Sequence, residues 1–86
     1  MRFQGAVVRE QGVTFVVIAV KSQVVDDHLQ ASSTINSLQP LFSGLPIILM
    51  AQDSFGRPIY YGRRDIARFL AGLPLSAIPW REYTVN

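Results

Sequence analysis

The sequence predicts an α+β fold: a single mixed sheet of four or five strands with two helices, in the order β-β-α-β-β-α, with or without a last strand. The apolar, β-branched stretch 13–20 is typical of a strand buried on both faces, and the apolar stretch 45–53 predicts a second buried strand. Two others, 28–39 and 63–71, carry apolar residues at helical spacing. With 86 residues the chain has room for one small domain, 1–86.

A β-hairpin opens the predicted fold. Residues 2–9 are typical of an extended strand, and the segment 10–12 offers the turn. The partner strand, 13–20, is apolar on both alternating faces, so we expect other parts of the protein to cover each of its sides.

The first helix is predicted at residues 28–39. Asp27 is a suitable N-cap because its carboxylate can accept hydrogen bonds from free backbone N–H groups, and Pro40 ends regular hydrogen bonding. A helix between strands 13–20 and 45–53 favours a right-handed crossover, which pairs the two strands in parallel. The apolar stripe of this helix, at spacings of four, three and four residues, is Ala31, Ile35, Leu38 and Phe42.

Residues 45–53 and 58–61 are predicted to form a second hairpin. Pro58 marks the later strand as an edge strand, because proline cannot donate to a sheet. Between the strands, Asp53 can bond its own backbone and Gly56 tolerates a positive φ, as a tight turn requires. A ligand group at Asp53 is the alternative to this turn.

The second helix is predicted at residues 63–71, with Gly72 as its C-cap. The tail, 79–85, alternates well enough to form a last edge strand. Trp80 in this tail suits either an anchor for a partner or a side chain that holds the terminus to the core. The apolar positions of the second helix are Ile66, Phe69, Leu70 and Leu73.

The strand 13–20 needs other parts of the protein on both of its faces, but we expect two helices from so small a chain to shield only one face of the sheet. Charged residues make up 16% of the chain, against about 25% in an ordinary soluble domain, so we expect an exposed apolar patch. We therefore infer a homo-oligomer, with a dimer favoured and the tail 80–85 as a segment that two copies could exchange. The alternative is that both helices and the tail wrap the sheet within one chain.

The composition excludes several kinds of chemistry. The chain has no cysteine, which rules out disulfides, a thiolate nucleophile and iron–sulfur sites, and its single histidine rules out a multi-histidine metal site. His28 stands beside Asp26 and Asp27, but adjacent residues do not face one another on a helix, and nothing completes a nucleophile–base–orienter set. We expect no catalytic residue, metal or cofactor. A small hydrolase or isomerase built around His28 is the least favoured alternative.

Arginines gather in the second half of the chain beside two tyrosines. Guanidinium groups bind phosphate in bidentate geometry and aromatic rings stack on bases, so this cluster suits an anionic ligand or nucleic acid. A nucleic-acid binder usually carries a larger excess than the net charge of +2 found here, and arginine stems also cover ordinary helix surface. The candidate ligand-binding residues are Arg57, Tyr61, Arg63, Arg64 and Arg68.

The apolar stretches fall short of the ~20 residues that a membrane-spanning helix needs, and Glu10 precedes the first of them, unlike the pattern of a secretory signal. We expect a cytoplasmic protein without a membrane partner. The leading hypothesis is a non-enzymatic binding or interaction module that acts as a homo-oligomer. The alternative is a protein that binds nucleic acid or a phosphate ligand through residues 57–68.

Overall fold

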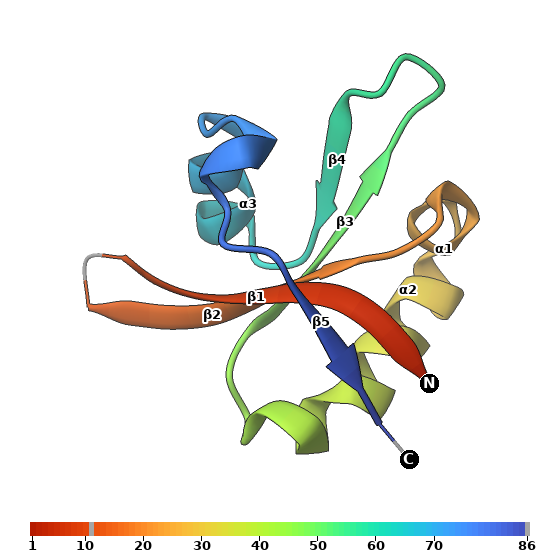
Figure 1. Ribbon diagram of the computed structural model, residues 1–86. Helices are drawn as coiled ribbons and strands as arrows, with labels where there is room; N and C mark the ends of the chain where they lie inside the picture. The colour runs from red at the N-terminus through yellow and green to blue at the C-terminus, as the bar shows by residue number, and fades with distance from the viewer. Residues whose placement is uncertain (11, 86) are drawn as a thin grey trace.

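The computed structural model describes residues 1–10 and 12–85, which contain one five-stranded mixed sheet (Figure 1). The strands are β1 (Arg2–Glu10), β2 (Val13–Ala19), β3 (Ile47–Gln52), β4 (Pro58–Tyr61) and β5 (Arg81–Thr84). They lie in the order β4-β3-β2-β1-β5, where β2 and β3 run parallel and the other neighbours run antiparallel. The predicted α+β class, the single mixed sheet and the parallel pair are confirmed.

Helices and short 3-10 turns connect these strands. They are α1 (Ser22–Asp26), α2 (His28–Leu38), η1 (Gln39–Phe42), α3 (Arg64–Ala71) and η2 (Leu75–Ala77). The sequence pattern predicts α2 and α3 but not α1, which turns the chain between β2 and α2. In the described part of the chain, no helix is long and apolar enough to cross a membrane.

The β1–β2 hairpin forms as predicted. Val7 pairs with Val16 and Gly5 with Ile18, while Gln11, in the predicted turn, lies outside the described residues. β2 lies between β1 and β3, and its residues 15–18 are at most 2% exposed. The prediction of a central strand buried on both faces is therefore confirmed.

α2 begins at the predicted residue because Asp27 caps it. Oδ1 of Asp27 accepts hydrogen bonds from the backbone N–H groups of Leu29 at 2.9 Å and of Gln30 at 3.4 Å. These bonds satisfy two of the four N–H groups that a helix leaves without a partner at its start.

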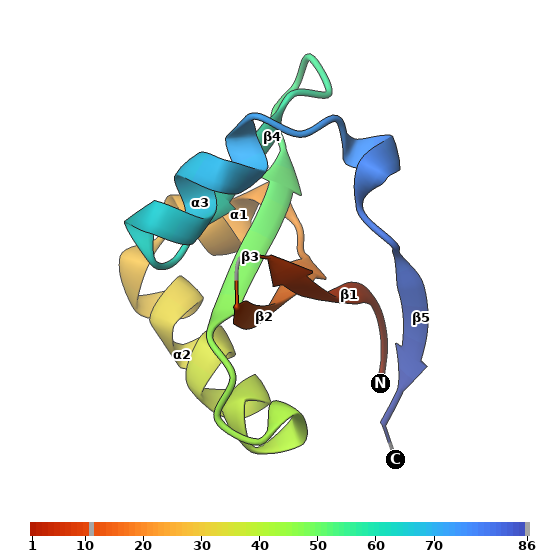
Figure 2. The ribbon, with the colours of Figure 1, turned by 90° about the vertical axis from the view of Figure 1, so that its left-hand side faces the viewer.

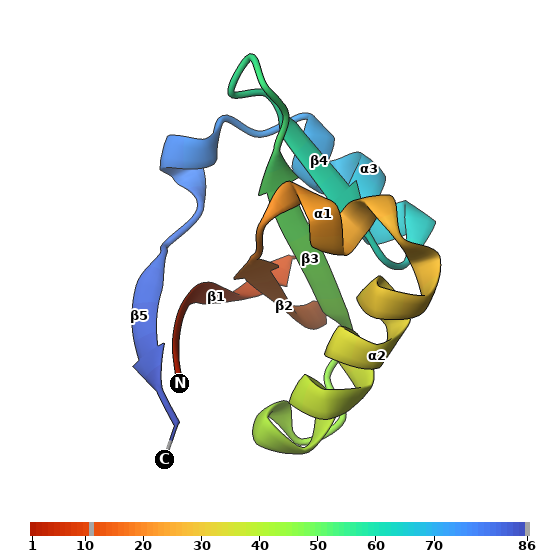
Figure 3. The same cartoon turned by 90° about the vertical axis from the view of Figure 1, so that its right-hand side faces the viewer.

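One face of the sheet lies under α1, α2 and η1, and Figure 3 shows α1 and α2 in front of β3. Aliphatic side chains fill the space between these helices and the strands. The buried residues of this face are Val16, Ile18, Ala31, Leu38, Ile47 and Leu49.

The opposite face lies under α3 and the chain that follows it, which Figure 2 shows crossing from α3 to β5. Trp80 packs against this face and donates its indole N–H to the carbonyl oxygen of Leu75 at 3.1 Å, so it holds the tail to the core. β5 then pairs with β1 of the same chain. The buried residues of this face are Ala6, Phe15, Val17, Ile48, Met50, Ile66, Leu70 and Ile78.

A single chain therefore covers both faces of the central strand, and the expectation that the two helices shield one face only is wrong. The crossover between β2 and β3 places α2 on one face, whereas the turn at Gly62 sends α3 to the other (Figure 1). The uncovered sheet face that favoured a homo-oligomer does not exist among the described residues. Self-association stays a prediction, and it needs a different surface.

Candidate functional site

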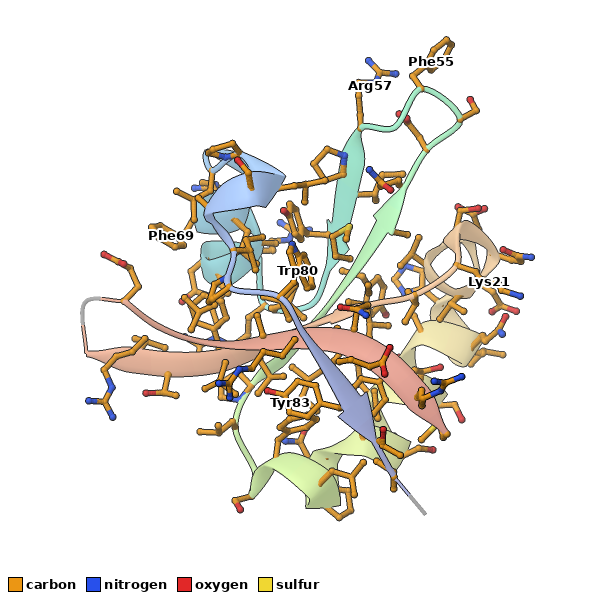
Figure 4. All side chains as sticks on the ribbon, viewed as in Figure 1. Lys21, Phe55, Arg57, Phe69, Trp80 and Tyr83 are labelled. Atoms are coloured by element: carbon orange, nitrogen blue, oxygen red, sulfur yellow. The ribbon has the colours of Figure 1, made fainter. Side chains whose placement is uncertain are left out.

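The β3–β4 hairpin projects from the body of the protein, and its tip carries Phe55 and Arg57 (Figures 1 and 4). The Phe55 side chain is 82% exposed. All the other aromatic side chains of the chain are buried or half-buried. Among the described residues, Phe55 is thus the Phe, Tyr or Trp that is mostly exposed to solvent.

Asp53 fixes the shape of this tip. Its Oδ1 accepts from the backbone N–H groups of Phe55 and Arg57, both at 2.9 Å, and its Oδ2 accepts from Nε of Arg57 at 3.0 Å. Gly56 takes a φ of +79°, which favours glycine, and its carbonyl oxygen accepts from Nε2 of Gln52 at 3.0 Å. The turn interpretation of Asp53 is confirmed, and the loop is held by its own hydrogen bonds.

The electrostatics of the tip are balanced. The N–H of Arg57 holds the pKa of the Asp53 carboxyl below its ordinary value, and the N–H of Phe55 and the Arg57 guanidinium act in the same direction. The guanidinium carbon of Arg57 lies 5.2 Å from the centroid of the Phe55 ring, in cation–π range. The tip therefore combines an exposed ring with a cation that is already paired to a carboxylate.

The five predicted ligand-binding residues do not form one surface. Arg57 lies at the tip of the hairpin, while Tyr61 lies at the far end of β4, opposite Leu49, and packs on the α2 face. The others, Arg63, Arg64 and Arg68, lie in and before α3, on the opposite face. Their binding of an anionic ligand stays a prediction, but it cannot involve all five side chains at once.

Arg63 is committed to a neighbour. Its Nη2 and Nε lie 2.7 and 3.1 Å from the two carboxylate oxygens of Asp65. This bidentate pair lowers the pKa of Asp65 and raises that of Arg63. Among the described residues, Arg64 and Arg68 make no ion pair, so they are the cations of the predicted cluster that are left for a ligand.

His28 has a partner that the sequence does not reveal. Its Nδ1 lies 2.9 Å from the hydroxyl of Tyr61, and Oγ of Ser32, one helical turn along α2, lies 3.4 Å from the same hydroxyl. Asp27 is used as the helix cap instead. The set bridges α2 and β4 at an exposed position, and His28 and Ser32 share a helix face that spacing could have shown. Their common contact with Tyr61 depends on how α2 packs on the sheet.

The sequence pattern does not single out Phe55. The turn around it was predicted, and the only signal for its exposure is a large apolar residue between Asp53 and Gly56, inside a polar turn. In the part of the chain that the structure describes, no three side chains of His, Cys, Asp or Glu come together as a metal site would require.

Comparison with family models, with curated proteins and with solved structures gives no match for this chain. A function for this chain is therefore inferred from the chemistry of its surface.

Proposed function

We propose that the protein is a non-enzymatic binding module that associates with a second copy of itself through the tip of the β3–β4 hairpin. The observation that carries the proposal is the Phe55 side chain, 82% exposed on a loop that Asp53 holds in one shape. Aromatic side chains that become buried on binding contribute much of the energy of protein interfaces. A loop that is ordered before binding loses little conformational entropy when it binds.

The charge of the tip favours a protein partner over nucleic acid. The Asp53 carboxylate and the Arg57 guanidinium pair at 3.0 Å, so the tip carries no net excess of positive charge. Affinity for nucleic acid depends on unpaired cations that replace the counterions of the phosphates. A protein surface that offers an apolar pocket for the ring and a polar rim for the ion pair suits this tip better than nucleic acid does.

One observation favours the second candidate function, binding of nucleic acid or a phosphate ligand. Arg64 and Arg68 lie four residues apart on α3, both exposed, with no ion pair among the described residues. Binding of a single-stranded oligonucleotide that weakens steeply with salt, and that Arg64→Ala plus Arg68→Ala abolishes, would support this candidate in place of the first.

The self-association is tested by light scattering across a concentration series, with Phe55→Ala beside the wild type. We expect the wild-type mass to rise above the 9.6 kDa of one chain with concentration, and Phe55→Ala to weaken association by about 30-fold, the effect of losing a ~2 kcal/mol anchor.

Leu29→Ala is the matched control, because Leu29 is 83% exposed on α2, away from the tip. It should associate like the wild type. A wild-type mass that stays at 9.6 kDa up to millimolar concentration, or equal losses in Phe55→Ala and Leu29→Ala, would contradict the proposal.

A further inference from the structure

A pocket of about 180 Å³ lies between α3 and the end of the β1–β2 hairpin where Glu10 pairs with Val13. Two carboxylates and four apolar side chains line it: Glu10, Val13, Phe15, Asp65, Ile66 and Phe69. The pocket belongs to neither the hairpin tip nor the cluster around His28.

The floor of this pocket suits an aromatic ring. Phe15 and Ile66 are only 2% and 4% exposed, and the ring of Phe69 meets Phe15 edge-on, with centroids 6.4 Å apart. Apolar cavities of about 150 Å³ are large enough to hold benzene. A phenyl side chain that entered here would meet the apolar and aromatic atoms that rings prefer as neighbours.

The rim of the pocket carries a carboxylate, Glu10, that can pair with Arg57, the cation at the hairpin tip. Glu10 makes no ion pair among the described residues, and Asp65 is bound to Arg63. Nε of Arg57 donates a hydrogen bond to Asp53. The Arg57 side chain is 73% exposed, and its two terminal guanidinium nitrogens have no partner in the described chain. A guanidinium can therefore keep its bond to Asp53 and also reach a second carboxylate.

We propose that this pocket receives Phe55 of a second copy, with Arg57 of that copy pairing with Glu10 at the rim; this inference rests on the proposed function. Phe55 cannot serve its own chain, because its loop is fixed by Asp53 and Figure 4 shows it far from Phe69, across the molecule. Each copy thus offers one tip and one pocket.

A second pocket argues for this choice by contrast. It has a volume of about 260 Å³ and lies between α2 and the ends of β1 and β2, but no charged side chain lines it. The ring alone would fit there, whereas the adjacent cation would find no carboxylate. Charge complementarity therefore selects the pocket with Glu10 on its rim.

The test pairs a chain without a tip with a chain without a pocket. Phe55→Ala removes the tip, and Val13→Lys places a long cation in the pocket mouth, at a position that is already 37% exposed. Val7→Lys is the matched control, because Val7 is 46% exposed on the other face of the same hairpin. Glu10→Lys, which reverses the rim charge, is a second variant of the pocket. Thermal unfolding checks that all four variants fold.

Sedimentation equilibrium measures the masses. We expect Val13→Lys and Glu10→Lys each to associate at least tenfold more weakly than the wild type, and Val7→Lys to match the wild type. A mixture of Phe55→Ala with Val13→Lys should form dimers that grow no further, because one tip and one pocket remain between them.

Self-association of Val13→Lys at the wild-type level, or a mixture that stays monomeric, would overturn the assignment of the pocket and leave the role of Phe55 standing. A wild type that is monomeric at all concentrations would instead remove the proposed function itself. The two failures are therefore distinct.

Discussion

Gly62 is the residue on which the position of α3 depends. Its φ is +149°, and a Cβ added there would lie 2.5 Å from Cδ1 of Ile48 and 3.1 Å from the carbonyl oxygen of Ile47. A side chain would have to move the Ile48 side chain and would crowd the backbone of β3, and the conformation itself is strained for any residue with a Cβ. The glycine is what lets the chain leave β4 and pass close to β3 on its way to the opposite face.

Gly62→Ala should lower the free energy of unfolding by about 2 kcal/mol or more, because it combines backbone strain with a steric clash against Ile48. Urea denaturation measures the loss. Gly72→Ala is the control: Gly72 has a φ of −85° and its Cβ would meet an atom no closer than 3.5 Å, so its stability should stay within about 0.5 kcal/mol of the wild type. Equal effects of the two variants would refute this account of the turn.

At the scale of an element, the β3–β4 hairpin depends on the ionised form of Asp53. The folded protein holds the pKa of Asp53 below its ordinary value, so the folded state binds the proton of this group less tightly than the unfolded state does. The stability that Asp53 contributes is therefore present above pH ~4 and is lost as the pH falls through its lower folded pKa.

Asp53→Asn should lose less stability than the wild type when the pH falls from about 5 to 2, because the amide keeps an oxygen acceptor but no longer titrates. Urea denaturation at a series of pH values gives the comparison. Asp65 has a lowered pKa as well, so Asp65→Asn should also flatten the acid branch while leaving the tip unchanged. An acid branch identical to that of the wild type in Asp53→Asn would mean that its carboxylate does not hold the loop.

Most of the elements follow from local pattern. The Asp27 cap, the Gly72 C-cap, the turn at Asp53 and the edge position of β4 all depend on residues near in sequence, and all are confirmed. The faces that the helices cover are different, because they depend on the turn at Gly62 and on contacts between distant segments. For that reason the sequence could not separate a sheet wrapped by one chain from a sheet with an open face.

The candidate site can be predicted from the sequence only in part, because it also depends on contacts between distant segments. The sequence pattern identifies Arg57 as a candidate, but its bond to Asp53 and its place at the tip set it apart from Arg64 and Arg68. The pocket that includes Val13 and Phe69 joins residues more than fifty positions apart. No spacing rule within a single segment points to such a pair.

At the scale of the whole molecule, stability and binding depend on different features of the protein. Two apolar clusters, one on each face of the sheet, stabilise the fold without a partner. Binding is then left to features at the surface, namely a projecting hairpin with an exposed ring and a pocket with a carboxylate on its rim. Association through such small surfaces is expected to be weak, with little area buried per contact.

Amide chemical shifts of the isotope-labelled protein over a dilution series test the role of the hairpin tip most directly. We predict that the signals of residues 54–57 move as the concentration rises from micromolar to millimolar, since the environment of the Phe55 ring changes when a second copy binds it. Signals of the tip that stay fixed over that range, or shifts confined to other surfaces, would contradict the account.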